Sequence, residues 1–313
     1  MANWKSNLIE AYRFTTTPYR AWQMVQRRSA GHVPIFVVFY HRISDSFPNP
    51  WTLGCREFEQ QIDWFERHFQ IVGLDECQRR INSGNNSQPT LAITFDDGYA
   101  ENSEFALPLL LERRIPVTYF VTVDNAIHQR PFAHDIQFGK ALATNSIESL
   151  RAISMAGVEI GAHTRNHVDL GKLNDPVQLV DEVITSSREL ANLVGRPIRY
   201  FAFPYGLRQN MNAAVFRLLK EEGFAGACTA MGSWNDIGGD AFQISRIHGD
   251  PSFARMKNWF CFDPRLASVV PFDYENAIEY LNTTIKPAPI FPPVGRSGVV
   301  LPGLNATEPL SHV

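Results

Sequence analysis

The sequence predicts an α/β fold in which parallel strands form a barrel. Short apolar runs of strand length, such as Ile35–Tyr40 and Val117–Val123, alternate with stretches whose apolar residues have helical spacing. This alternation is typical of parallel sheets. The chain has 313 residues, of which 44% are hydrophobic, and this is enough for one barrel-sized core. The net charge of −3 gives no electrostatic reason to expect a nucleic-acid partner.

Residues 1–32 are predicted to form a helical arm. The arm has one acid, Glu10, against several basic residues with aromatic residues interleaved. These are Lys5, Arg13, Arg20, Arg27 and Arg28, with Trp4, Tyr12, Phe14, Tyr19 and Trp22. Such an arm could rest on a membrane surface. Alternatively, it packs on the barrel exterior with its charges solvated. Because we find neither a secretion signal nor a transmembrane run, we expect a cytoplasmic protein, membrane-peripheral at most through this arm.

Residues 33–268 are expected to form the catalytic domain, in which strands and helices follow one another. The strands are predicted at Ile35–Tyr40, Leu91–Phe95, Val117–Val123, Gly157–Ala162, Arg199–Pro204, Ala225–Thr229 and Ile244–His248. The helices are predicted at Phe58–Phe69, from Gly73 onward, and at Ala106–Arg114, Ile147–Ala156, Val177–Leu193 and Ala213–Glu222.

Two stretches lack a clear period. Asp124–Thr144 is interpreted as a loop with His128, His134 and Asp135 as surface groups, although His134 or Asp135 could also face a substrate. Residues 269–313 form a proline-rich C-terminal extension that we expect to be largely disordered from 285. The four cysteines have no CxxC spacing and are predicted to be reduced thiols, with Cys77 exposed.

Adjacent carboxylates follow the predicted strand Leu91–Phe95. Asp96 and Asp97 would repel each other at the end of a buried strand unless a cation lies beside them. Gly98 allows a sharp turn that points both side chains into one cleft. A simple Asp-Asp-Gly turn before a helix is the alternative interpretation.

Two histidines lie four residues apart after the predicted strand Gly157–Ala162. His163 and His167 can both turn a neutral imidazole toward one metal ion. Thr164 stands where a helical zinc protease needs its glutamate base, so that class is disfavoured. Two histidines and one aspartate supply three ligands and leave positions open, which is typical of a catalytic metal site.

Three motifs together resemble a known family. Thr94–Gly98 (TFDDG), His163–His167 (HTRNH) and Phe201–Gly206 (FAFPYG) are similar, in order and separation, to motifs of the polysaccharide deacetylases of the NodB-homology type, carbohydrate esterase family 4. The resemblance extends from about Val33 to Ile247. It implies a metal-dependent N-deacetylase on a distorted (β/α) barrel of about seven parallel strands. Tyr40–Ile43 (YHRI) resembles the YHxI/V element of one branch, whose histidine enters the site from the N-terminal side.

The resemblance also implies roles for individual residues. Asp97, His163 and His167 would hold a divalent metal, with zinc expected first and cobalt, nickel or manganese as alternatives. Asp96 would be the general base, and the backbone N–H of Tyr205 would stabilise the oxyanion. Thr164 would brace the loop between the histidines.

Two positions depart from the family pattern. The third motif normally has an arginine that orients the base, and Ala202 occupies that position here. Arg42, Arg199 or Arg246 could replace it in space. The usual C-terminal histidine element is only approximated around His248, so the proton donor is either His41 or His248. We favour His41, because it follows a strong buried strand within the YHRI element.

These expectations lead to a function. We predict a hydrolase that cleaves a linear amide C–N bond, removing N-acetyl groups from an N-acetylhexosamine-containing glycan or glycan precursor and releasing acetate. One alternative is a degenerate barrel that binds glycans without turnover, which an intact ligand set disfavours. The other is a magnesium-dependent phosphohydrolase, which the paired histidines and the absence of a phosphate-binding glycine loop disfavour.

Overall fold

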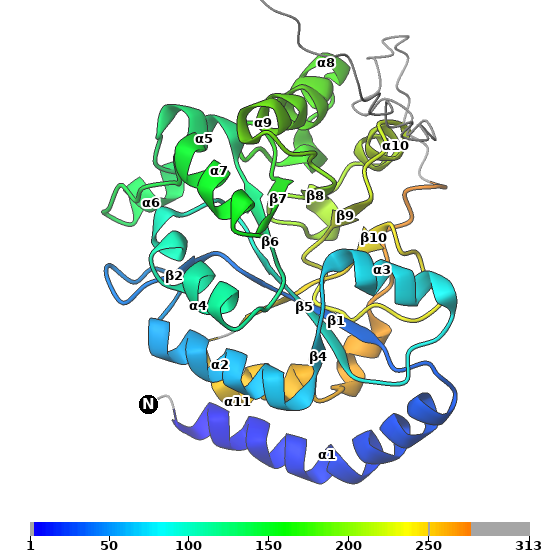
Figure 1. Cartoon of the computed structure of the whole chain (residues 1–313). Coiled ribbons are helices and arrows are strands. Elements are labelled where there is room, and N and C mark those ends of the chain that lie inside the picture. The colour runs from blue at the N-terminus through cyan, green and yellow to red at the C-terminus, as the bar shows by residue number, and fades with distance from the viewer. Residues whose placement is uncertain (1–2, 250, 277–313) are drawn as a thin grey trace, which may run out of the picture.

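A parallel sheet lies at the centre of the structure (Figure 1). The computed structural model describes residues 3–249 and 251–276, and within them this sheet has nine strands in the order β10-β9-β8-β7-β6-β5-β1-β11, with β4 beside the start of β5. The strands are β1 (Ile35–Tyr40), β4 (Gln70–Ile71), β5 (Thr90–Phe95), β6 (Val117–Val121), β7 (Glu159–Ala162), β8 (Tyr200–Ala202), β9 (Gly226–Cys228), β10 (Gln243–Ile244) and β11 (Ile247–His248). A separate parallel pair joins β2 (Arg42–Ile43) to β3 (Thr52–Leu53). The predicted α/β class and parallel sheet are confirmed.

Helices surround the curled sheet (Figure 1). They are α1 (Asn3–Ser29), α2 (Cys55–His68), α3 (Leu74–Ser83), α4 (Ala106–Glu112), α5 (Val123–His128), α6 (Ala133–Gln137), α7 (Ile147–Met155), α8 (Pro176–Val180), α9 (Ser186–Val194), α10 (Ala213–Glu221) and α11 (Phe253–Phe260). No described helix is both long enough and apolar enough to cross a membrane.

The sheet curls so that its two edge strands approach each other. β10 and β11 lie at opposite ends of the strand order, yet just Ser245 and Arg246 separate them in the chain. Two residues can span only about 10 Å, so the edges must be close neighbours. The predicted strand Ile244–His248 is therefore wrong as a single strand, because the chain changes edges at its centre. This change of edge directs Arg246 into the barrel.

Burial of both faces of the sheet accounts for the apolar composition of its strands. All six residues of β1 and of β5 are buried, and the two strands pair in register from Ile35 opposite Thr90 to Tyr40 opposite Phe95. A small interior cluster includes Val37, Ala92 and Ala202, while a larger cluster packs between the sheet and the helices. Each large apolar side chain buried in this way contributes about 1.5–3 kcal/mol.

Three local expectations need correction. Asp124–Thr144 is not a loop throughout, since it contains α5 and α6. The predicted helix Val177–Leu193 is interrupted by a π-helical turn at Asp181–Thr185 between α8 and α9, although it ends at Gly195 as expected. Cys77 is buried rather than exposed, because it lies on the inner side of α3.

The start of the C-terminal extension packs on the domain. Tyr274 is buried and stacks on Phe216 of α10, with ring centroids 4.4 Å apart and an interplanar angle of 6°. The expectation of disorder from 285 onward falls outside the described residues.

Candidate metal and catalytic site

The site lies where several strands end. Asp96 and Asp97 follow β5, His163 follows β7, His41 follows β1, and Tyr205 comes shortly after β8. The carboxyl ends of parallel strands meet at one edge, so the strand pairing brings these side chains together. They line a cavity of about 470 Å³. Its walls are Phe39, His41, Trp51, Asp96, Asp97, His134, His163, His167, Phe203, Tyr205, Leu207, Ala230 and His248.

Unusual backbone conformations are concentrated at this site. Asp97, Thr164, His167 and Tyr205 have positive φ angles of 74°, 63°, 57° and 61°. Such angles cost non-glycine residues of order 1 kcal/mol or more, and they persist where the surrounding structure holds them. At Asp97 the turn separates its side chain from that of Asp96, so that the two adjacent carboxylates reach different partners.

Asp97, His163 and His167 form a group suited to a metal ion. Asp97 Oδ1 lies 3.5 Å from His163 Nε2 and 3.3 Å from His167 Nε2. The three ligand atoms all lie within 4.8 Å of one another. A tetrahedral zinc ion with bonds of about 2.0–2.2 Å separates its ligands by about 3.3–3.5 Å, so these two distances fit it. Asp97 Oδ1 is also buried without a hydrogen-bond partner, which is costly unless a cation occupies the site.

The protonation of these residues favours the same interpretation. His163 Nδ1 lies 2.8 Å from the carbonyl oxygen of Ala202, and because a carbonyl accepts, Nδ1 donates and Nε2 is left with its lone pair. Burial lowers the pKa of His163 to about 4, so its ring is neutral at neutral pH. Burial opposes the charge on Asp97, but His167, together with His41 and His163, more than offsets that effect, and the pKa of Asp97 lies well below its usual value.

Glu182 braces the loop between the two histidines. Its carboxylate accepts hydrogen bonds from the backbone N–H groups of Arg165 and Asn166, at 3.0 and 2.9 Å, and from the Asn166 side chain at 2.9 Å. Thr164 Oγ1 is buried without a hydrogen-bond partner, and Thr164 instead holds the loop through its carbonyl, which accepts from the backbone N–H of Val123 at 3.1 Å. Sequence reasoning missed Glu182, because it lies in the π-helical turn of a segment predicted to be a regular helix.

Of the three candidate arginines, Arg246 is the one that binds Asp96. Its Nη1 and Nη2 atoms donate to the two carboxylate oxygens of Asp96 at 2.7 and 2.8 Å, and its Nε donates to the carbonyl of Thr229. Both side chains are almost fully buried. Burial alone would raise the pKa of Asp96, but Arg246, together with His163 and His41, more than offsets it, and the pKa lies below its usual value. Asp96 is therefore an ionised, oriented carboxylate.

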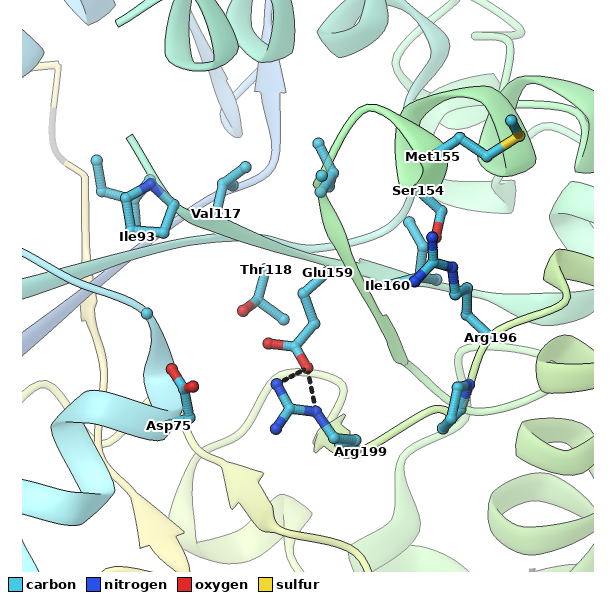
Figure 2. A pocket seen from close by; sticks show the side chains of 15 residues that line it. Asp75, Ile93, Val117, Thr118, Ser154, Met155, Glu159, Ile160, Arg196 and Arg199 are labelled. Atoms are coloured by element: carbon cyan, nitrogen blue, oxygen red, sulfur yellow. Dashed lines mark hydrogen bonds and ion pairs between the residues drawn. The ribbon is translucent and has the colours of Figure 1, made fainter. Parts of the chain in front are cut away.

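The other two candidate arginines lie away from Asp96. Arg42 is buried but binds Glu101 and the loop carbonyls of Ser46 and Phe47. Arg199 lies at the opposite, amino ends of the strands, where it pairs with Glu159 at 2.7 Å beside a second cavity of about 400 Å³ (Figure 2). The carboxylate of Glu159, whose pKa is raised by burial, is satisfied there by Arg199.

Both candidate proton donors reach the cavity. The ring centroids of His41 and His248 are 5.6 Å apart, and both rings pack edge-on against Phe39. His41 Nδ1 is buried without a partner. Burial and the neighbouring His41 lower the pKa of His248 to about 4, so His248 is neutral at neutral pH.

Tyr205 lines one side of the cavity. Its φ of 61° follows from the turn in which Gly206 N–H donates to the carbonyl of Pro204. The Tyr205 side chain is half-exposed and lies 5.1 Å from the His167 ring.

Tyr99, Trp51, His134 and Asp135 form a hydrogen-bonded network beside the cavity that the sequence did not predict. Asp135 is buried, which corrects the expectation of a surface group, and it accepts hydrogen bonds from Tyr99 at 2.9 Å and from the Trp51 indole at 3.1 Å. Burial raises the pKa of Asp135 to about 6. His134 joins the network through Tyr99 and lines the cavity, as its alternative interpretation allowed.

The comparisons with known proteins agree with this geometry. Residues 83–235 match the polysaccharide deacetylase family. The chain is 24% identical over 172 residues to YxkH of Bacillus subtilis (strain 168), which is assigned by name to the polysaccharide deacetylases, with 54% of this chain and 56% of the relative covered. It is 30% identical over 120 residues to the chitooligosaccharide deacetylase of Bradyrhizobium sp. (strain ANU 289), with 37% and 45% covered. The chain thus spans about half the length of these relatives.

Solved structures share the fold. IcaB from Ammonifex degensii superposes with a TM-score of 0.61 at 23% identity, covering 73% of this chain and 97% of that one. The deacetylase PplD from Streptococcus pyogenes, solved in complex with acetate, gives a TM-score of 0.59 at 18% identity, covering 76% and 99%.

Proposed function

We propose that this chain, whose residues 83–235 match the polysaccharide deacetylase family, is a metal-dependent hydrolase that removes N-acetyl groups from an N-acetylhexosamine-containing glycan or glycan precursor. One observation carries the proposal. Asp97 faces two histidines, whereas the adjacent Asp96 is held by Arg246 at the same cavity. Amide hydrolysis needs this division between a group that binds a cation and a group that accepts a proton.

The residues fit a divalent metal, and Asp97, His163 and His167 would hold it. Zinc suits this ligand set first, and cobalt, nickel or manganese are alternatives. When bound, the metal would supply Lewis acidity that activates water and polarises the acetamide carbonyl.

We assign the remaining steps to two side chains and one backbone N–H group of the cavity. Asp96 accepts a proton from the attacking water, because Arg246 keeps its carboxylate ionised and oriented. The backbone N–H of Tyr205 donates to the oxygen that gains negative charge. His41 gives a proton to the departing amine as the C–N bond breaks. The water oxygen ends in acetate and the sugar keeps a free amine, so the reaction balances.

The mouth suits a carbohydrate. Trp51, Phe39 and Tyr205 present aromatic surfaces beside the polar cluster. Such surfaces pack on the apolar faces of sugar rings, while the polar groups fix the acetamide. This assignment extends to the present chain what the names of its relatives say of chitooligosaccharide and polysaccharide substrates.

Acetate release tests the proposal. The metal-loaded chain is assayed with N-acetylglucosamine oligomers, lipid-linked N-acetylated sugars and nucleotide sugars, with the Asp96→Asn variant as the matched control. We expect the unmodified chain to release acetate from at least one of these substrate classes. The Asp96→Asn variant should release none. Release of phosphate from phosphomonoesters with magnesium, and no acetate, would instead support the phosphohydrolase. Tight glycan binding with neither product would support a degenerate barrel.

A further inference from the structure

Helix α1 presents an apolar face to solvent. Leu8, Phe14, Tyr19, Trp22 and Val25 are exposed by 59%, 81%, 49%, 58% and 63%. At 3.6 residues per turn these positions fall within an arc of roughly 140°, so they share one side, here called the outer face of α1. Figure 1 shows α1 along the lower border of the molecule, with no other described element on its outer side.

The opposite side of α1 attaches to the domain largely through polar groups. Arg20 is buried and donates to the carbonyls of Asn258 and Cys261 at 2.9 and 3.1 Å. The Tyr12 hydroxyl donates to Asp263, and Arg27 pairs with Asp236. A surface helix of a globular protein normally buries its apolar stripe and exposes its polar one. In α1 the largest aromatic side chains point outward, so its apolar face is left for another partner.

The chemistry of the outer face suits a membrane surface. Tyr19 and Trp22 stack with ring centroids 6.1 Å apart, and these two residue types favour the boundary between lipid headgroups and acyl chains. The exposed polar residues on the same side are uncharged, namely Asn7, Thr15, Gln26 and Ser29. The one acid of the helix, Glu10, is already bound by Arg13 and Lys257.

We propose that the outer face of α1 binds the surface of an anionic lipid bilayer. The apolar side chains would lie at the headgroup boundary, and Arg28, which is exposed in the last turn of the helix, would be attracted by anionic headgroups. Arg13, Arg20 and Arg27 are already bound by groups of the chain itself. An anionic bilayer complements the charge of Arg28, and Tyr19 and Trp22 are residue types that favour its headgroup boundary. The proposal is independent of the proposed chemistry at the cavity.

Vesicle co-sedimentation of the full chain tests this proposal. The vesicles contain phosphatidylcholine and phosphatidylglycerol in equal parts. The test variant is Phe14→Ser/Trp22→Ser, and the control is Met155→Ser/Val177→Ser, which removes two side chains of similar exposure from α7 and α8. We expect the unmodified chain and the control to sediment with vesicles. The test variant should partition about a hundredfold more weakly, since each large apolar side chain contributes roughly tenfold.

Circular dichroism confirms that both variants fold, and sedimentation velocity without vesicles reports on self-association. Failure of the unmodified chain to bind vesicles, or equal binding by both variants, would overturn the proposal. A dimer that is lost only in Phe14→Ser/Trp22→Ser, without vesicle binding, would assign the face to a second copy and also overturn it.

Discussion

At the scale of single residues, the separation of Asp96 from Asp97 determines what the site can do. The positive φ of Asp97 turns two neighbouring carboxylates toward different partners, two histidines on one side and Arg246 on the other. Arg246 performs this orientation from a position 150 residues away in the chain. A buried ion pair of this kind is costly to break, because removal of one partner leaves the other charged and unpaired.

Arg246 can therefore be tested by moving the arginine. Arg246→Ala should lower the free energy of unfolding by about 3–5 kcal/mol and reduce acetate release while metal still binds. The double variant Arg246→Ala/Ala202→Arg has an arginine at the position where the family motif normally has one. Ala202 lies in the smaller buried cluster. We expect the double variant to regain turnover, measured as kcat for acetate release. Recovery of stability without recovery of turnover would contradict the positioning role.

The proton donor gives a second prediction at this scale. His41→Ala should lower kcat by about two to four orders of magnitude with metal content unchanged, the usual effect of a positioned acid. His248→Ala is the matched comparison, because the two rings share one wall and His248 is neutral at neutral pH. If His41→Ala is nearly silent and His248→Ala is inactive, the proton comes from the C-terminal side.

At the scale of elements, the site is positioned by the carboxyl ends of the strands and by the π-helical turn Asp181–Thr185. The approach of Asp97, His163 and His167 to one another could be predicted from sequence, because Asp97 and His163 lie at or near the ends of short apolar runs and His167 follows His163 by four residues. Arg246 could be named only as one of three candidates, since its place depends on a chain that changes sheet edges between β10 and β11. Asp135 was expected on the surface because the short helices α5 and α6 leave no clear period in the sequence.

A substitution of Glu182 tests whether the π-helical turn supports the loop between His163 and His167. Glu182→Gln replaces an acceptor oxygen with a donor opposite two backbone N–H groups, so the histidine loop should loosen. We expect the Kd for zinc to rise about 10–100-fold, as for other groups that orient metal ligands. Glu189→Gln is the control, because Glu189 contacts the Arg165 side chain and is partly exposed. Equal effects of the two variants on zinc affinity would argue against this role.

At the scale of the whole molecule, the described C-terminal segment and α1 both pack on the barrel. α1 contacts α11 through polar groups, and Tyr274 covers Phe216. The domain therefore extends beyond the part of the chain that matches the family, at both ends.

Truncation measures where the fold ends. Deleting Ile285–Val313 should leave the Tm and acetate release nearly unchanged, because this segment is rich in proline and poor in periodic apolar residues. Deleting from Pro271 onward removes the buried Tyr274 and should lower the Tm by roughly 2–4 °C for each kcal/mol lost. A large fall in Tm on the shorter deletion would show that residues 285–313 pack against the domain.

The central claim is that Asp97 binds the metal and Asp96 handles the proton. The direct measurement is metal stoichiometry together with acetate-release rate for Asp96→Asn, Asp97→Ala, His163→Ala and His167→Ala. We predict that Asp96→Asn keeps its metal but loses turnover, and that the other three lose metal, because their side chains form the ligand group. Loss of metal in Asp96→Asn together with full metal in Asp97→Ala would reverse the two roles and contradict this account.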